Sequence, residues 1–79
     1  MDTETILIVP KAVHERLAID VLGYKPTKSI VADTPRRLRG LGMKGQKLII
    51  CNYSWFSNEA WEEIQIIKRR FSEVEYINT

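Results

Sequence analysis

Three short, continuously apolar runs constrain the fold of this chain more than any other feature. The runs are Ile6–Val9, Ile30–Ala32 and Leu48–Cys51, and each one ends at a polar or turn-forming residue. A strand that is covered on both faces loses the alternation of apolar and polar residues that a half-exposed strand shows. Unbroken apolar runs of this length therefore predict buried parallel strands and an α/β fold.

The segments between these runs have helical or loop patterns, and the chain ends in a fourth, alternating run. We expect strands over about residues 5–9, 29–32, 47–51 and 74–77, the last of them at a sheet edge because Glu75 alternates with its apolar neighbours. Two main helices are expected over residues 11–22 and from residue 57 or 58 to about 71, with a helix of one to two turns over residues 34–40. The sequence thus predicts a small, mostly parallel four-stranded sheet flanked by two main helices, in the order strand, helix, strand, short helix, strand, helix, strand.

The apolar positions of the two main helices indicate which sides face the sheet. In the first helix the expected buried stripe comprises Val13, Leu17, Ala18, Val21 and Leu22. In the second helix it comprises Ala60, Ile64, Ile67 and Phe71, with Trp61 at its border.

Length and composition exclude several classes of protein. The chain has 79 residues, which predicts a single domain over residues 1–79 with a core near the lower size limit. With one cysteine and one histidine, neither a disulfide framework nor a structural zinc site is expected. The sequence has no apolar stretch of about 20 residues and no basic, signal-like start, so we expect a cytoplasmic protein without membrane contact.

The middle of the chain is locally cationic, although the formal net charge is only +2. Between residues 25 and 47, Asp33 is the one acid among seven basic residues: Lys25, Lys28, Arg36, Arg37, Arg39, Lys44 and Lys47. Aromatic residues then follow the third predicted strand. Arginine and aromatic side chains dominate the binding energy of many protein interfaces, and they also contact phosphates and unpaired bases.

These residues form the predicted partner-binding site. It comprises Arg36, Arg37, Arg39, Lys44, Lys47, Tyr53, Trp55 and Phe56. The main hypothesis is a small, non-enzymatic regulatory or accessory protein, of the kind that phages and mobile elements encode, which binds a larger protein through this site. The alternative is a nucleic-acid-binding protein that uses the segment from Arg36 to Lys47. A simpler interpretation also exists, in which the arginines are a solvated helix face and the aromatic rings fold over the core.

An enzyme is the third class considered, with His14, Asp33 and Cys51 near the carboxyl edge of the sheet. A general base needs an orienting partner and a nearby nucleophile, and the spacing of these residues supplies neither. The glycines at positions 40, 42 and 45 precede a strand instead of a helix, so they do not form a phosphate-binding loop. No catalytic residue, cofactor or metal is therefore expected.

Residues 6–10, 32–41 and 47–52 resemble the stretch between the Walker A and Walker B regions of terminase- and helicase-like P-loop ATPases. In that family a polar-ended strand precedes an Arg-Leu-Arg-Gly-Leu segment, found here at residues 37–41, and an apolar strand then ends in acids. This chain has no Walker A loop, and Asn52 and Tyr53 replace the acidic pair. The resemblance implies a shared core topology without ATP hydrolysis.

The number of helices indicates how well the sheet is covered. Three strands with two apolar faces need a layer on each side, whereas the sequence offers two full helices and one short one. We therefore expect an apolar part of the sheet, or a flank of the second helix with Trp61 and Ile66, to remain open. Such a surface predicts self-association or a stable protein partner.

Overall fold

The computed structural model describes residues 4–33, 35–38 and 45–79 of the chain. Its main elements are the strands β1 (Thr5–Val9), β2 (Lys28–Val31), β3 (Gly45–Cys51) and β4 (Phe71–Ile77) and the helices α1 (Ala12–Leu22) and α2 (Asn58–Ile67). Three short 3-10 helices complete the order: η1 (Pro35–Arg37) before β3, η2 (Tyr53–Trp55) before α2, and η3 (Lys68–Arg70) before β4. The predicted short helix over residues 34–40 is thus a 3-10 helix in its described part.

The four strands form one sheet in the order β2-β1-β3-β4, and every neighbouring pair is parallel. Ile8 pairs with Ile30 on one side and with Ile50 on the other, so the three apolar runs lie side by side. β1 and β3 are the two central strands, whereas β2 is the end strand and its apolar residues are half-buried, not buried on both faces as predicted. The α/β architecture with a four-stranded sheet and two main helices is confirmed. The sheet is parallel throughout, including β4 at one end.

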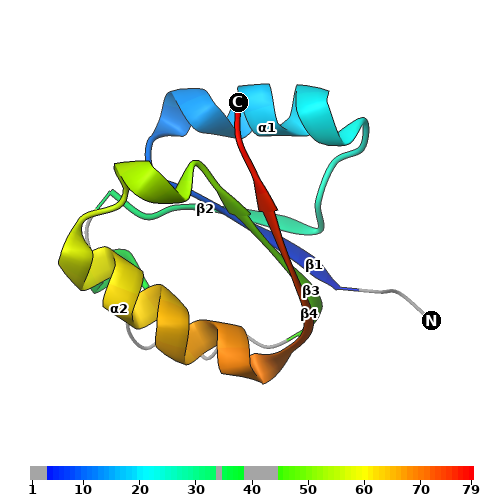
Figure 1. Cartoon of the computed structure of the whole chain (residues 1–79). Helices are drawn as coiled ribbons and strands as arrows, with labels where there is room; N and C mark the ends of the chain where they lie inside the picture. The colour runs from blue at the N-terminus through cyan, green and yellow to red at the C-terminus, as the bar shows by residue number, and fades with distance from the viewer. Residues whose placement is uncertain (1–3, 34, 39–44) are drawn as a thin grey trace.

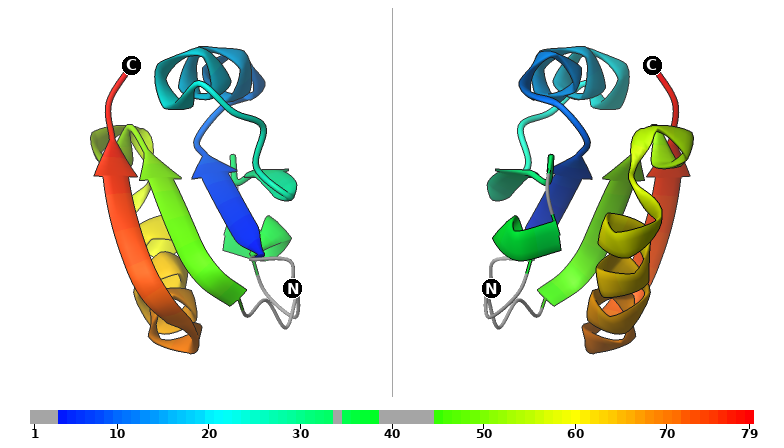
Figure 2. Two further views of the ribbon diagram at one scale, coloured as in Figure 1. Left: turned by 90° about the vertical axis from the view of Figure 1, so that its right-hand side faces the viewer. Right: turned by 90° about the vertical axis from the view of Figure 1, so that its left-hand side faces the viewer.

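The two helices cover opposite faces of this sheet (Figures 1 and 2). On one face, Ile6, Ile8, Leu48 and Ile50 pack with the buried side of α2 and with Leu38 after η1. On the other face, Leu7, Val9, Ile49 and Cys51 pack with Ala18 of α1. Because successive side chains of a strand point to opposite faces, each apolar run supplies both cores.

Helix α1 buries a narrower stripe than its sequence predicts. His14 and Ala18 are buried and Leu22 packs against the core, whereas Val13, Leu17 and Val21 are 63%, 44% and 57% exposed. The five predicted core positions cover about half of the helix circumference, while a helix lying on a sheet buries a stripe about 100° wide. The prediction that Val13, Leu17 and Val21 face the core was therefore wrong.

Helix α2 begins as predicted but ends earlier. The Ser57 hydroxyl accepts a hydrogen bond of 3.1 Å from the Ala60 amide, and Ala60, Ile64 and Ile67 are buried. The helix ends at Ile67, and Phe71 is the first residue of β4 instead of the last residue of α2. Phe71 belongs to the same core cluster in either arrangement, so its apolar character did not distinguish a helix from a strand.

The sequence predicts an uncovered apolar part of the sheet, but the described part of the sheet that α1 does not cover carries charged side chains. Helix α1 lies over β1 and β2, whereas β3 and β4 face the viewer in the left view of Figure 2, with α2 behind them. There, Nζ of Lys47 lies 3.4 Å from Oε2 of Glu73 and 3.0 Å from Oε2 of Glu75. This part of the sheet therefore does not offer the open apolar surface that the sequence predicts.

Candidate protein-interaction site

The strand order creates a topological switch point between β1 and β3. From β1 the chain moves outward to β2, and from β3 it moves in the opposite direction to β4. In open parallel sheets, ligands bind in the crevice at the carboxyl ends of the strands at such a point. In this chain His14, in the first turn of α1, and Trp55 of η2 meet there.

His14 and Trp55 pack against each other at this edge. Their ring centroids are 5.1 Å apart with an interplanar angle of 77°, an edge-to-face contact. His14 is 6% exposed, and its Nδ1 is buried without a hydrogen-bond partner in the described part of the chain. The ring of His14 thus packs against an indole and not against the carboxylate that would orient a catalytic base.

Asn52 anchors the carboxyl-terminal residues to the end of β3. Its Nδ2 donates a hydrogen bond of 2.8 Å to Oγ1 of Thr79, and its Oδ1 accepts one of 2.8 Å from the Thr79 amide. Asn52 also has a left-handed backbone, with φ 48° and ψ 57°, which asparagine adopts more readily than most residues. Asn52 stands where the P-loop ATPases that the chain resembles have an acidic residue. In this chain Asn52 has a structural role.

Cys51 is fully buried at the end of β3. Burial raises the pKa of its thiol, and a hydrogen bond with Thr79 offsets part of this effect. Because the thiolate is the reactive form, this environment disfavours nucleophilic chemistry at neutral pH.

Three aromatic rings gather near the free edge of β4. Tyr53 of η2 lies 5.8 Å from Trp61 of α2 and 6.2 Å from Tyr76 of β4, and the centroids of Trp61 and Tyr76 are 6.3 Å apart. These rings line a hollow of about 270 Å³, here called the aromatic pocket. Tyr53 and Tyr76 are about half exposed, so the rings are accessible to a partner.

The structure separates the predicted partner-binding residues into several places. Tyr53 lines the aromatic pocket, Trp55 is 61% exposed and contacts His14, and Phe56 is a core residue. Lys47 lies on the opposite face of the sheet from Tyr76, between Glu73 and Glu75.

Two arginines of the predicted site, Arg36 and Arg37, lie shortly after the end of β2. Arg36 and Arg37 are exposed, and Nε of Arg37 forms an ion pair of 3.0 Å with Oδ1 of Asp33. Arg39 and Lys44 lie outside the described residues. Arg37 lines a hollow with residues of β2, whereas Tyr53 contacts Tyr76 of β4, the strand at the other end of the sheet.

The sequence analysis placed Trp61 with Ile66 on an expected open flank of the second helix, but it did not assign Trp61 or Tyr76 to the partner-binding site. Of these two flank residues, Trp61 lines the aromatic pocket, whereas Ile66 is exposed and does not line it. The available signals were the place of Trp61 at the border of the helical stripe and the alternation of Tyr76 in an edge strand. Tyr53 and Trp61 lie on consecutive elements, η2 and α2, and the parallel pairing of β3 with β4 brings Tyr76 to them.

Comparisons of this chain with protein-family models, with curated protein sequences and with solved structures found no match. The resemblance to P-loop ATPases therefore stays an expectation. Among the described residues, no helix is long and apolar enough to cross a membrane, and no three metal-binding side chains are grouped.

Proposed function

We propose that this chain is a small, non-enzymatic regulatory or accessory protein that binds a larger protein through the aromatic pocket. The observation that carries the proposal is the group of Tyr53, Trp61 and Tyr76, whose rings lie about 6 Å apart around an open, apolar hollow. Tyrosine and tryptophan are enriched among the residues that dominate protein interfaces, because each buries a large area and loses little rotamer freedom.

The surroundings of the candidate catalytic residues support a non-enzymatic function. His14 packs against Trp55, Asp33 forms an ion pair with Arg37, and the Cys51 thiol is buried with a raised pKa. Each of these groups at the carboxyl edge of the sheet thus has a structural contact within the chain.

The test is co-purification from cells that express the tagged protein. We expect a protein partner that the wild type retains and that a Tyr53→Ala, Tyr76→Thr variant loses. The matched control is Ile66→Ala, because Ile66 is about as exposed as Tyr53 and Tyr76 but does not line the aromatic pocket. If both variants retain the same proteins as the wild type, the proposal is wrong.

Nucleic-acid binding by the segment from Arg36 to Lys47 is the alternative. Arg36 and Arg37 favour it because they are exposed, but Asp33 neutralises Arg37, and Lys47 is paired with two glutamates. The two functions respond differently to salt, since phosphate contacts weaken steeply between 50 and 200 mM salt, roughly 10³-fold for about six contacts, whereas an apolar protein interface does not. Co-purification of nucleic acid that dissociates between about 50 and 200 mM salt would support nucleic-acid binding.

A further inference from the structure

In the part of the chain that the structure describes, no strand covers one backbone edge of β4. β4 is the last strand of this sheet, and its strand neighbour among the described residues is β3 (Figure 2). The Asn52 amide donates a hydrogen bond of 2.8 Å to the carbonyl of Ile77, so the backbone groups of Ile77 point toward β3. Because these groups alternate along a strand, the amides and carbonyls of Val74 and Tyr76 point away from the sheet.

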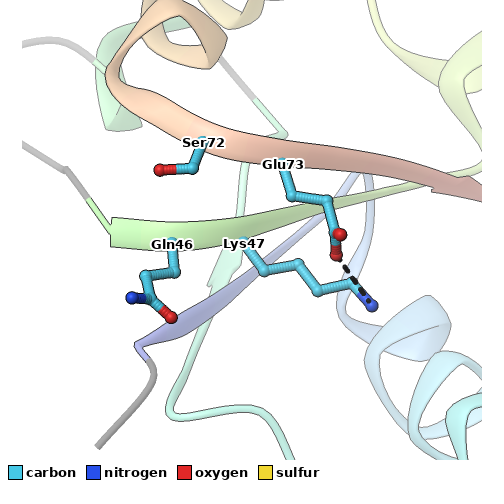
Figure 3. Close-up of a pocket in the computed structure, with 4 residues that line it drawn as sticks. All are labelled: Gln46, Lys47, Ser72 and Glu73. Atoms are coloured by element: carbon cyan, nitrogen blue, oxygen red, sulfur yellow. Dashed lines mark ion pairs between the residues drawn. The ribbon is translucent and has the colours of Figure 1, made fainter.

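The two faces beside this edge differ in chemistry. On the face of α2, Tyr76 lines the aromatic pocket and Val74 packs against the core. On the other face, Glu73 and Glu75 both contact the ammonium group of Lys47, and Figure 3 shows the pair with Glu73. Two carboxylates around one ammonium group leave a local charge of −1, and the side chains of Glu73 and Glu75 are 65% and 44% exposed.

From this geometry we propose that the edge of β4 binds an extended segment of a protein partner as a fifth strand, with apolar or aromatic residues alternating with lysine or arginine. The apolar side chains enter the aromatic pocket, and the basic side chains face Glu73 and Glu75. Main-chain hydrogen bonds to an exposed edge provide affinity in this mode of recognition, and pockets for alternate side chains provide specificity. This inference rests on the proposed function and names the chemistry of the partner.

In the register centred on Val74, the charges of β4 disfavour a second copy of the chain as the occupant. An antiparallel pair of β4 strands centred on Val74 places Glu73 of one copy opposite Glu75 of the other, twice in each dimer. Like charges in directly opposite positions destabilise a strand pair. Exposed Arg69 and Arg70 precede β4, so the basic residues of a partner are expected opposite the middle of the strand.

The experiment uses the full chain and a synthetic probe, acetyl-Lys-Val-Lys-Phe-Lys-Val-Lys-amide. Binding is followed by amide hydrogen exchange and by chemical-shift titration in solution. We expect the amides of Val74 and Tyr76 to become protected when the peptide binds, while those of Glu75 and Ile77, which already face β3, change little. Two control peptides are used. The first has the same composition as the probe but with all its lysines placed first, and the second keeps the alternating order with glutamate in place of lysine.

Three variants test the separate contributions. Tyr53→Ala removes one ring of the aromatic pocket, and we expect about tenfold weaker binding. Glu73→Lys reverses an exposed charge, and it is expected to weaken binding of the basic peptide and to favour the glutamate peptide. Ile66→Ala changes an exposed apolar residue that does not line the aromatic pocket, so its affinity should equal that of the wild type. Circular dichroism verifies the fold of each variant.

Several outcomes would overturn the inference. These are equal binding of all three peptides, protection of amides elsewhere than on the outer edge of β4, self-pairing of β4 as the protein concentration rises, and absence of binding at millimolar peptide. The proposed function would survive each of these results if a cellular partner still depends on Tyr53 and Tyr76. The two ideas therefore fail independently.

Discussion

At the end of β3, Asn52 combines a left-handed backbone with two side-chain hydrogen bonds to Thr79. Asn52→Gly keeps the backbone conformation but loses both bonds, so we expect a loss of about 1–2 kcal/mol in the free energy of unfolding. Asn52→Ala loses the bonds and also strains the backbone, which adds about 1 kcal/mol. Urea denaturation of the two variants measures the difference. Equal stability of the glycine and alanine variants would show that the left-handed conformation is without cost.

The raised pKa values of Cys51 and Lys47 predict how the free energy of unfolding changes at alkaline pH. Burial raises the pKa of the Cys51 thiol above 9.0, and hydrogen bonding to Glu75 raises the pKa of the Lys47 ammonium group above 10.5. In both cases the folded chain keeps a proton that the unfolded chain has lost. The contributions of these two groups to the free energy of unfolding are therefore fully present below about pH 9 and are lost as the pH rises through the folded-state pKa values.

A cysteine variant separates these two contributions. In Cys51→Ala we expect the alkaline loss to begin near pH 10.5 instead of pH 9, because only the Lys47 contribution remains of the two. Urea midpoints between pH 7 and pH 11 measure this, and slopes are compared because the smaller side chain also lowers stability at every pH. Identical slopes for wild type and variant would contradict the role of the buried thiol.

At the scale of the elements, α1 allows a direct test of which side packs on the sheet. Val21 is 57% exposed, so Val21→Gln is expected to change the free energy of unfolding by less than about 0.5 kcal/mol. Ala18 is fully buried on the same helix, and Ala18→Gln places a larger polar group in the core, with an expected loss of about 3 kcal/mol or more. Thermal denaturation of both variants measures these changes in the free energy of unfolding. Similar losses for the two variants would support the broader buried stripe that the sequence predicts.

The sequence predicts the strands better than the surfaces of the helices. β1 has the predicted bounds, because Ile6–Val9 is buried on both faces and Pro10 follows it. Leu17 was misplaced because its apolar character is compatible with the edge of a buried stripe as well as with its centre. The position of the stripe depends on how α1 lies on β1 and β2, which is a tertiary contact that the local sequence does not contain.

The candidate site could be predicted only in part for a similar reason. Tyr53 was identified because it follows a strand at the carboxyl edge, where functional residues collect. Its neighbours in the aromatic pocket depend on the order of the strands, since Tyr76 lies beside η2 only when β4 pairs with β3. Phe56, which follows the same strand, turns into the core instead.

At the scale of the whole molecule, the exposed apolar residues of α1 bear on self-association. One ridge on the helix surface consists of three residues spaced four positions apart, Val13, Leu17 and Val21. Ridges of this spacing interdigitate when two helices cross at about −50°. A valine stands four residues before Leu17 and another stands four residues after it. In a two-fold dimer centred on Leu17, with the two helices running in opposite directions, Val13 therefore packs against Val21 of the second copy.

We therefore expect weak association of two copies through α1, at a surface separate from the edge of β4. Arg16 and Asp20 are exposed on the same helix, and in the two-fold arrangement each lies near the opposite charge of the second copy. Light scattering should show an apparent mass that rises with the concentration of the wild type, and Leu17→Glu should remain monomeric because the substitution places two carboxylates at the centre. Ile66→Glu, at an exposed apolar position of α2, is the matched control and should associate as the wild type does. A wild type that is monomeric up to millimolar concentration would remove the dimer and leave the ridge of α1 as an ordinary exposed surface.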